Sequence, residues 1–429
     1  MSSDVLSAMD KAIEDGVNVL SFSLGLGTLE YDQDAVAIGA LAAVKKGIFV
    51  SASAGNDGLS ESTLMNVAPW ITTIGAGTVD RDFPAIAILG NGKAFGGVST
   101  LFKSSFDNFT EKIVLIDMGS GTDEFKTPTN RPLGIIYANT APNGRELVAP
   151  HKLIPSLTVG KISGDEIRDY ILKDAKPTAM IKFKGTVLHV KPAPVVAGFS
   201  SRGPNSVTPE ILKPDLIAPG VNILAAWTRA TGLHQSDPDL KQVVDFSIQS
   251  GTSMSCPHLS GIAALLKAAA IRSALMTTAN RNGNDGKPIL DSTDHTPSTP
   301  FLHGAGHVSP ISALNPGLIY DLTAEDYLDF LCASNYTSSQ IRTVARRDFT
   351  CDPKKRYRIA DFNYPSFAVI IDHSRGEGGA YKYTRVVTSV GGGGTYRVKV
   401  VSETRVVNIS VEPAVIEFKE VNQRKSYTH

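Results

Sequence analysis

The sequence predicts an α/β fold with a parallel sheet, an α+β insertion and a small C-terminal β-sandwich. Near the start, helical and strand-like segments alternate, and the strands read as apolar runs, which is typical of a parallel sheet covered on both faces. Over residues 95–190, short β-like runs alternate with Gly, Asn and Pro turns, which indicates a separate insertion. From residue 361 onward, alternating strands such as Thr395–Val400 favour a β-sandwich. We expect four segments, 1–94, 95–190, 191–345 and 361–429.

The first elements follow in the order helix, strand, helix, strand. Residues 1–16 predict an amphipathic helix with Asp4 as its N-cap. Residues 17–23 read as a strand, residues 34–46 as an Ala-rich helix that ends at Gly47, and residues 48–50 as the start of a second strand.

Both predicted strands end in small residues. The first runs into Ser23-Leu24-Gly25 and the second into Ser53-Ala54-Gly55-Asn56. In open parallel sheets, ligands bind outside the carboxyl ends of the strands. Small side chains there would leave the backbone accessible to an extended substrate chain, so these residues are candidates for substrate binding.

The composition excludes several classes of protein. The chain has 429 residues, of which 42% are hydrophobic and 20% charged, so it can bury a core. Lys and Arg number 42, as do Asp and Glu, so no net charge favours a nucleic-acid partner. No apolar run is long enough to span a bilayer, so no membrane partner is expected. No run of Asp has calcium-loop spacing, so we expect neither a metal nor a cofactor.

Three cysteines, Cys256, Cys332 and Cys351, are too few for a disulfide scaffold. Cys332 and Cys351 are close enough in sequence to pair, which would stabilise the fold by about 3 kcal/mol. Free buried thiols are an equal alternative.

The first residues bear on export of the chain. Residues 1–16 have no basic segment, apolar segment or cleavage site of a signal peptide. Sequons at Asn108, Asn335 and Asn408 matter only if the chain enters the secretory pathway, and chance alone could produce them.

The most informative segment is Gly251–Gly261, with the sequence GTSMSCPHLSG, followed by Ala/Leu-rich residues. We expect Ser253 at the start of a buried helix, where unpaired N–H groups and the helix dipole stabilise negative charge. A nucleophilic serine needs that stabilisation for the oxygen of the carbonyl it attacks. Pro257 fits the first helical turn. From spacing alone, an ordinary serine N-cap is the alternative.

This segment resembles the nucleophile motif of the subtilisin-like serine proteases (subtilases), and it is closest to the plant type. The similarity extends over almost the whole chain. Asn56 resembles the family's oxyanion-hole asparagine, and Ser23-Leu24-Gly25 is similar to the strand that pairs with the substrate backbone. Phe199–Asn205 and Lys213–Gly220 resemble the segments that precede the serine.

The resemblance implies an arrangement of domains. Residues 1–94 and 191–345 would be two parts of a subtilisin-like catalytic domain, 95–190 a protease-associated insertion, and 361–429 a truncated fibronectin-III-like domain. The family's Asp and His motifs would lie before residue 1, so we expect an N-terminally incomplete catalytic domain. Its uncovered sheet edge leads us to expect poor solubility or binding of a hydrophobic dye.

The resemblance also implies a serine endopeptidase that acts on protein or peptide substrates through an acyl-enzyme at Ser253, with Asn56 in the oxyanion hole. A serine hydroxyl is a weak nucleophile until an imidazole, oriented by a carboxylate, takes its proton. The sequence contains no Asp-Thr/Ser-Gly and no Gly-His-Gly-Thr. We therefore expect this chain to be inactive or strongly impaired. The alternative is a non-catalytic, subtilase-derived interaction protein or a fragment without function.

We expect no other group to replace the missing histidine and aspartate. His258 lies five residues after the serine on the same predicted helix, where it would pack or cap. His303 and His307 fall on or just before a stretch that is not catalytic in the family, and Asp57 and Asp215 do not fall on the family's Asp motif.

Two segments depart from the family pattern. Residues 266–276 run straight through where family members have a short loop, so the nucleophile helix and the next helix would fuse or repack. The insertion looks abbreviated around residues 119–131. Family members are typically secreted, so the resemblance implies an extracellular location, although we find no signal peptide.

Overall fold

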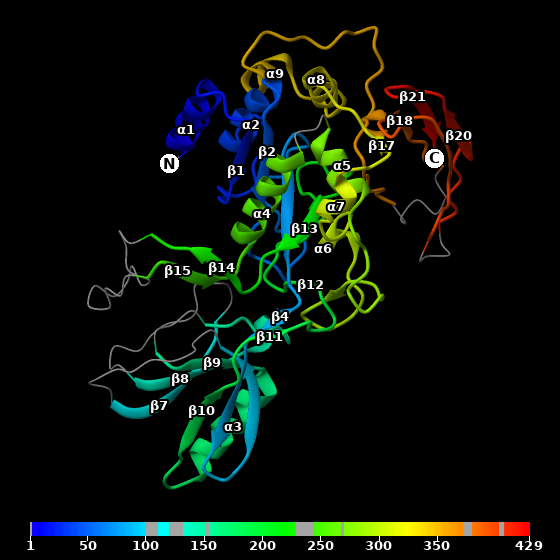
Figure 1. The fold of residues 1–429 in the computed structure, drawn as a ribbon. Coiled ribbons are helices and arrows are strands. Elements are labelled where there is room, and N and C mark those ends of the chain that lie inside the picture. Colours follow the sequence, from blue (N-terminus) through cyan, green and yellow to red (C-terminus); the bar gives the residue numbers. More distant parts are fainter. Residues whose placement is uncertain are drawn as a thin grey trace.

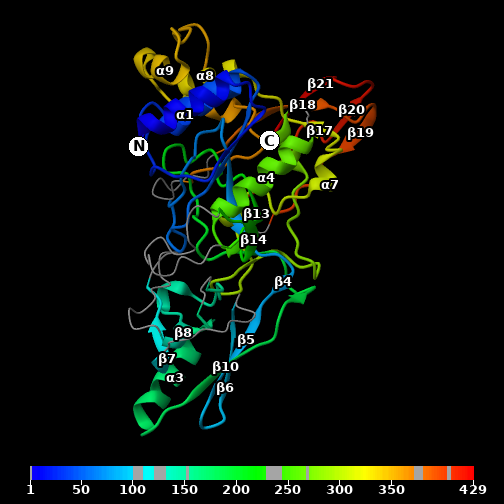
Figure 2. The same cartoon turned by 60° about the vertical axis from the view of Figure 1, so that its left-hand side comes forward.

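In the computed structural model, the described residues are 2–99, 110–119, 132–150, 154–228, 244–266, 270–371, 380–402 and 407–429. They form a main sheet, a second sheet below it and smaller sheets near the C-terminus (Figures 1 and 2). The main sheet and the helices on it carry the candidate site.

The main sheet has the order β1 (Val19–Phe22), β2 (Phe49–Ser53), β3 (Thr72–Gly77), β12 (Val195–Val196) and β16 (Leu290–Asp291), and β13 (Leu216–Pro219) also pairs with β3. The pairs β1–β2, β2–β3 and β3–β13 are parallel, whereas β12 runs antiparallel to β3. The parallel sheet expected from the apolar strands is confirmed. Among the described residues, β1 has no partner on its outer side and is an open edge.

Two helices position the strands that lead to the site. α4 (Thr252–Leu266) contacts β1, β2, β3 and β13, and α2 (Ala35–Lys45) packs on β2. The carboxylate of Asp34, which the sequence placed inside the helix, caps α2 by accepting the Val36 N–H (2.8 Å). Gly47 with φ +78° follows the end of the helix, as the sequence predicted. α1 (Ser2–Glu14), α8 (Ala324–Ala333) and α9 (Ser338–Ala345) complete this side, with α1 beginning before the predicted cap Asp4.

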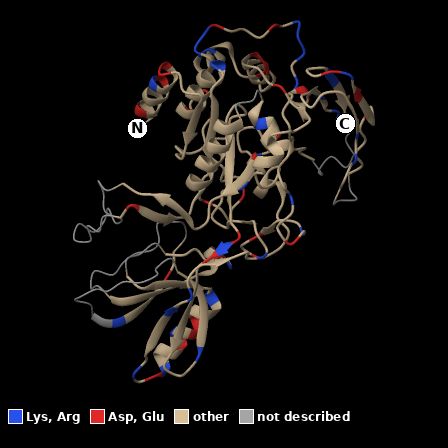
Figure 3. Ribbon diagram, viewed as in Figure 1, with Lys and Arg blue, Asp and Glu red and all other residues tan. Residues whose placement is uncertain are grey.

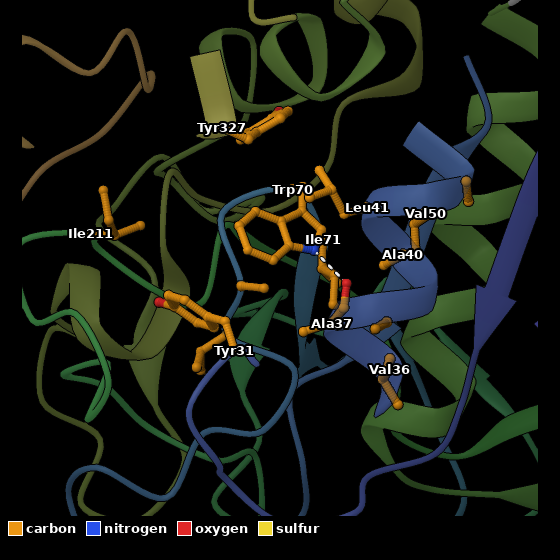
Figure 4. Packing of buried hydrophobic residues seen from close by; sticks show 14 of the residues in the cluster. Tyr31, Val36, Ala37, Ala40, Leu41, Val50, Trp70, Ile71, Ile211 and Tyr327 are labelled. Carbon is orange, nitrogen blue, oxygen red and sulfur yellow. Dashed lines mark hydrogen bonds between the residues drawn. The ribbon is translucent and has the colours of Figure 1, made fainter. Parts of the chain in front are cut away.

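Trp70 joins these helices in the core (Figure 4). Its Nε1–H donates to the carbonyl of Ala37 in α2 (2.8 Å). Its ring meets Tyr31 and Tyr327 edge-on, with centroids 5.3 and 5.9 Å apart. A buried aromatic side chain whose polar atom is satisfied adds a large apolar area without a desolvation cost. Trp70 therefore holds α2 and α8 to one core.

The second sheet has the order β10 (Ala179–Phe183), β5 (Pro84–Leu89), β6 (Ala94–Val98), β9 (Ser156–Val159), β8 (Pro132–Ala138) and β7 (Thr110–Asp117). With α3 (Lys161–Lys173), it encloses an apolar core separate from that of the main sheet. The boundary expected at residue 95 falls inside β6, because β5 pairs with both β6 and β10. A short ribbon of β4 (Arg81–Asp82) and β11 (Val187–Leu188) lies between the two sheets (Figure 1).

The C-terminal region consists of short antiparallel strands. One small sheet contains β17 (Leu318–Ile319), β18 (Thr384–Ser389) and β21 (Arg424–Thr428), and another β19 (Gly394–Arg397) and β20 (Val415–Phe418). Tyr364 ties this region to the main sheet, because its hydroxyl donates to Asp215 Oδ1 (2.5 Å). The remaining described elements are α5 (Ile271–Thr277), α6 (Pro300–His303), α7 (Pro310–Ala313), β14 (Ile223–Ala226), β15 (Phe246–Gln249) and the 3₁₀ helices Ala141–Asn143 and Ile359–Asp361.

Of the two alternatives for residues 266–276, fusion of the helices is wrong. α4 ends at Leu266, α5 begins at Ile271, and the two helices lie at 113° to one another. Ala270 adopts a left-handed conformation (φ +57°), which a continuous helix does not allow. The start of α4, where Ser253 lies, is unaffected. The abbreviated part of the insertion lies almost entirely outside the described residues.

The three cysteines form one disulfide bond and leave one free thiol. Cys332 in α8 forms a disulfide with Cys351, which follows α9, and Cys256 is free and buried in α4. The sequon residues Asn335 and Asn408 are exposed, whereas Asn108 lies outside the described residues.

Charged residues of both signs are interspersed over the ribbon, in keeping with their equal numbers (Figure 3). Within the described ranges, no single helix is long and apolar enough to cross a membrane; only α4 and α5 taken together, as a bent pair, reach that length and composition.

Candidate active site

Asn56 and the start of α4 meet at one end of the main sheet. Asn56 follows β2, and its Oδ1 accepts from both the N–H (2.9 Å) and the hydroxyl (3.0 Å) of Thr252. A backbone N–H can only donate, so the carboxamide oxygen must face Thr252 and its Nδ2 group points elsewhere. Thr252 Oγ1 in turn accepts from the Gly55 N–H (3.2 Å). These bonds fix the orientation of the carboxamide.

Two N–H donors converge beside Gly251. A Cβ built on Gly251 would lie 3.6 Å from Asn56 Nδ2 and 3.6 Å from the backbone nitrogen of Ser253. Because glycine has no Cβ, the two nitrogen atoms border a space that a side chain would otherwise fill, together with Met254 Sδ at 3.7 Å. Donors fixed in this way can stabilise negative charge that develops on an oxygen atom.

Ser253 is held against the end of β1. Its hydroxyl donates to the carbonyl of Ser23 (3.3 Å), and the Ser23 hydroxyl donates to the carbonyl of Ser253 (2.8 Å). The structure therefore brings Ser23 into contact with Ser253, and Asn56 into contact with the neighbouring Thr252. The carbonyl that receives the Ser253 proton is a far weaker base than an imidazole, so this bond does not activate the hydroxyl.

The predicted substrate-binding residues divide into accessible and buried ones. Leu24 is 53% exposed, and Gly25 and Gly55 flank the site, whereas Ser53 and Ala54 are 4% and 0% exposed. The Ser53 carbonyl already accepts a bond from Asn66 Nδ2 (2.8 Å), and the Ala54 carbonyl accepts one from the Met65 N–H (2.9 Å). Ser53 and Ala54 therefore support the wall behind Gly55 rather than present free groups at its surface.

The two carboxylates considered from the sequence, Asp57 and Asp215, have different surroundings. Asp215 is 0% exposed, and its Oδ2 forms a salt bridge with Lys213 (2.6 Å) and accepts the Thr73 N–H (2.7 Å). Burial lowers the pKa of Lys213 to about 8, and the carboxylate beside it opposes that shift. Asp57 is exposed, next to Asn56. Neither orients an imidazole.

No histidine in the described ranges forms a hydrogen bond with the Ser253 hydroxyl. His258 Nδ1 donates to the carbonyl of Met254 on its own helix (2.8 Å). Burial lowers the pKa of both His303 and His307 to about 4, so both rings are uncharged at neutral pH. The other described histidines are His189, His295 and His429; His151, His234 and His373 lie outside the described residues.

The sequence analysis did not single out Thr252, Met65 or Asn66, which hold the site together. Thr252 stands in the quoted motif next to Ser253, so its place there was a signal that could have found it. Met65 and Asn66 carried no such signal, because their contacts join segments far apart in the chain. In the part of the chain that the structure describes, no group of three or more His, Cys, Asp or Glu side chains could hold a metal ion.

Comparisons with known proteins show the family of the chain. Residues 2–300 match the model of the subtilase family, and residues 361–429 match a fibronectin type-III domain. The chain is 59% identical to subtilisin-like protease SBT1.7 and 45% identical to subtilisin-like protease SBT1.5, both of Arabidopsis thaliana, over 100% and 99% of its length. It spans 61% of the length of each of these relatives. The matches confirm the fold expected from the sequence, and the chain belongs to the subtilase family of serine proteases.

Proposed function

We propose that Ser253 is the nucleophile of a serine endopeptidase that cleaves peptide bonds through an acyl-enzyme, with Asn56 stabilising the oxyanion. The observation that carries this proposal is the convergence of Asn56 Nδ2 and the Ser253 N–H on the space beside Gly251. An oxygen of the attacked carbonyl would accept both N–H groups there, next to the Ser253 hydroxyl.

We propose further that this chain alone has the stabilising half of the site without the activating half. The Ser253 hydroxyl donates its hydrogen bond to the Ser23 carbonyl, and no described histidine is bonded to it; His258 bonds to the Met254 carbonyl instead. In subtilisin itself, losing the histidine costs about 10⁶ in turnover, whereas the oxyanion hole and substrate binding retain about 10³–10⁴ over water. We therefore expect hydrolysis by this chain to be faint.

Labelling with a fluorophosphonate probe tests the nucleophile. Phosphonylation requires an attacking serine, so labelling that is lost in Ser253→Ala but kept in Ser255→Ala would support the proposal. Ser255 is a suitable control because it lies in the same helix, is 0% exposed and bonds to the Ala218 carbonyl. Labelling of the Ser253→Ala variant at the native rate would contradict the role of Ser253.

A non-catalytic interaction protein is the second candidate, and the bond from Ser253 to a carbonyl in place of an imidazole favours it. In that case, the chain would bind peptides, but the fluorophosphonate probe would not label Ser253. The second sheet, which we assign as a protease-associated insertion, and the C-terminal domain would then contribute the binding surfaces.

We also propose an extracellular location for the protein. The disulfide between Cys332 and Cys351 supports it, because such bonds persist in oxidising compartments and are rare in the cytosol.

A further inference from the structure

A loop of the second sheet contacts the main sheet through the side chain of Glu146. The loop is bonded to its own sheet at two points. Asn139, which follows β8, donates from Nδ2 to the carbonyl of Glu146 (2.5 Å), and the Thr158 hydroxyl in β9 donates to the carbonyl of Val148 (2.8 Å). The Glu146 carboxylate itself accepts the N–H of Gly198, shortly after β12 of the main sheet (2.9 Å). This side chain therefore fixes one sheet against the other.

The backbone of Gly198 is closely enclosed at this contact. A Cβ built on it would lie 3.0 Å from Glu146 Oε2, 3.0 Å from Thr293 Cγ2 and 3.3 Å from Ser292 Oγ. Approaches of this kind are closer than those of most real Cβ atoms, so the glycine is held between the carboxylate and the segment after β16. A displacement of Glu146 would remove the support of Gly198 on one side.

The segment that Glu146 holds, residues 198–201, packs directly on residues 55–58, which include Asn56. Three hydrogen bonds join the two segments: the Gly58 N–H to the Phe199 carbonyl (2.9 Å), the Asp57 N–H to the Ser201 hydroxyl (3.1 Å), and the Ser201 N–H to the Gly55 carbonyl (3.0 Å). A Cβ on Gly58 would lie 2.3 Å from the Ser200 carbonyl oxygen, so the two backbones are in direct contact. Because these bonds lie on both sides of Asn56, the position of its backbone depends on residues 198–201.

The charges around Glu146 make this contact sensitive to its protonation. Glu146 Oε1 is buried and has no hydrogen-bond partner among the described residues. Asp291 in β16 adds a like charge, and the nearby cation Arg202 is already paired with Asp291 (2.9 Å). Through burial, the pKa of the Glu146 side chain rises to about 7. The other charged or titratable groups of these segments are exposed: Arg145, Asp57, Asp294 and His295. Ionised Glu146 would therefore place a poorly compensated charge in the contact and weaken it.

We propose that Glu146 is a positioning residue, through which the second sheet holds Asn56 at the place that stabilisation of the oxyanion requires. The coupling has two steps, from the carboxylate to residues 198–201 and from there to residues 55–58. The chemical consequence at Asn56 rests on the proposed function, whereas the coupling between the two sheets does not.

Hydrogen–deuterium exchange of the whole chain, measured by mass spectrometry, tests the coupling. Glu146→Ala removes the acceptor of the Gly198 N–H. The amides of residues 55–58 should then exchange about tenfold faster than in the native chain at pH 5, the effect of one lost hydrogen bond, while those of α2 should not change. Glu146→Gln keeps an acceptor oxygen and should restore the native rates. A general loss of stability would accelerate exchange in α2 as well, so it would not produce this pattern.

The pH profile is a second readout. A pKa that is higher in the closed contact than in the open one means that opening becomes easier as pH rises towards 7. After correction for the intrinsic rate, exchange of residues 55–58 in the native chain should therefore rise by about tenfold or more from pH 5 to pH 8. Glu146→Gln should show no such rise. Fluorophosphonate labelling of Ser253 should be slower in Glu146→Ala than in the native chain at the same pH, by about the factor found for exchange.

Asn222→Gly is a matched control, because it breaks another contact of the same loop. Asn222 Oδ1 accepts the Ala149 N–H (3.4 Å), and glycine tolerates the left-handed φ of +54° at this position. This variant should leave the exchange of residues 55–58 unchanged.

Native exchange of residues 55–58 in Glu146→Ala, or a rise with pH that Glu146→Gln shares with the native chain, would overturn the inference. If Glu146→Ala does not fold, the comparison of Glu146→Gln with the native chain over pH decides alone. Exchange that follows the expected pattern in a native chain that the fluorophosphonate does not label would support the coupling and overturn only the proposed role of Ser253.

Discussion

The oxygen and the nitrogen of the Asn56 carboxamide have different surroundings. Its oxygen accepts the Thr252 N–H and so caps α4, and its Nδ2 group faces the space beside Gly251. The cap contributes to stability, and the free N–H would contribute to reactivity. Because the oxygen contributes to stability and the N–H group would contribute to reactivity, a substitution of Asn56 should change both the free energy of unfolding and the rate of reaction at Ser253, by different amounts.

Asn56→Leu keeps the volume of the side chain and removes both hydrogen-bonding ends. We expect the rate of fluorophosphonate labelling at Ser253 to fall by about 10²–10³, the loss known for this donor in subtilisin. The free energy of unfolding should fall by only about 1 kcal/mol, the usual contribution of an N-cap. A labelling rate equal to that of the native chain would exclude an oxyanion role for Asn56.

At the scale of elements, α8 and α9 depend on a covalent link. The disulfide from Cys332 to Cys351 closes a short loop that contains α9 and the turn after it, and α8 in turn packs on Trp70 through Tyr327. The disulfide therefore restricts the unfolded chain, because residues 332 and 351 cannot move apart.

Cys332→Ser combined with Cys351→Ser should lower the free energy of unfolding in urea by about 3 kcal/mol. The difference from the native chain should disappear when both are measured with a reductant. Cys256→Ala is the control, because that thiol is free and its loss should not change the response to the reductant. Equal stability of native and double-variant chains without a reductant would show that the bridge contributes nothing.

Local patterns predicted local elements well. α2 lies between Asp34 and Gly47 as expected, because a cap and a left-handed glycine are signals within a few residues of the helix. The extent of the second sheet was not predictable, since β5 pairs with β10 across many residues and the pattern of either strand contains no sign of it. The sequence left fusion and repacking of the helices around Ala270 open, because an Ala-rich run favours a continuous helix and only the folded chain shows the break.

The candidate site shows the same division. Ser253 and Asn56 were found because each stands in a contiguous motif, and the fold brings the two motifs together. Met65 was not found, because it packs against two glycines, Gly25 and Gly55, that lie in other segments. Contacts between segments that are separate in the sequence form only when the chain folds, so no local pattern predicts them.

At the scale of the whole molecule, Glu146 links the second sheet to the main one. Its Oε2 accepts the Gly198 N–H (2.9 Å), and the adjoining Phe199 carbonyl accepts the N–H of Gly58, two residues after Asn56. Burial raises the pKa of Glu146 to about 7, and the nearby charge of Asp291 contributes to this rise. Hydrogen bonds to the carboxylate from Gly198 and its neighbours lower the pKa and offset the rise in part.

This pKa predicts a pH dependence of stability. A folded-state pKa above the ordinary value means that the folded chain binds the proton more tightly, so the free energy of unfolding should fall as pH rises from about 4.5 to about 7. Glu146→Gln removes the ionisable group and with it this pH dependence. The variant should be more stable than the native chain by up to about 3 kcal/mol at pH 8, and should show no such gain at pH 4.5. Thermal unfolding at a series of pH values measures the difference, and a difference that does not vary with pH would contradict the assignment.

The bare α-carbon of Gly251 has an evolutionary consequence. The nearest atoms to a Cβ at Gly251 lie 3.6 Å away, but the φ of +157° at this position is one that residues with a side chain rarely adopt, so an alanine here would strain the backbone. A gene that drifted to alanine at this codon would therefore weaken the turn that leads into α4, and it would also fill the space that we propose for the oxyanion. Selection for a stable fold and selection for the proposed activity would thus both keep glycine at this position.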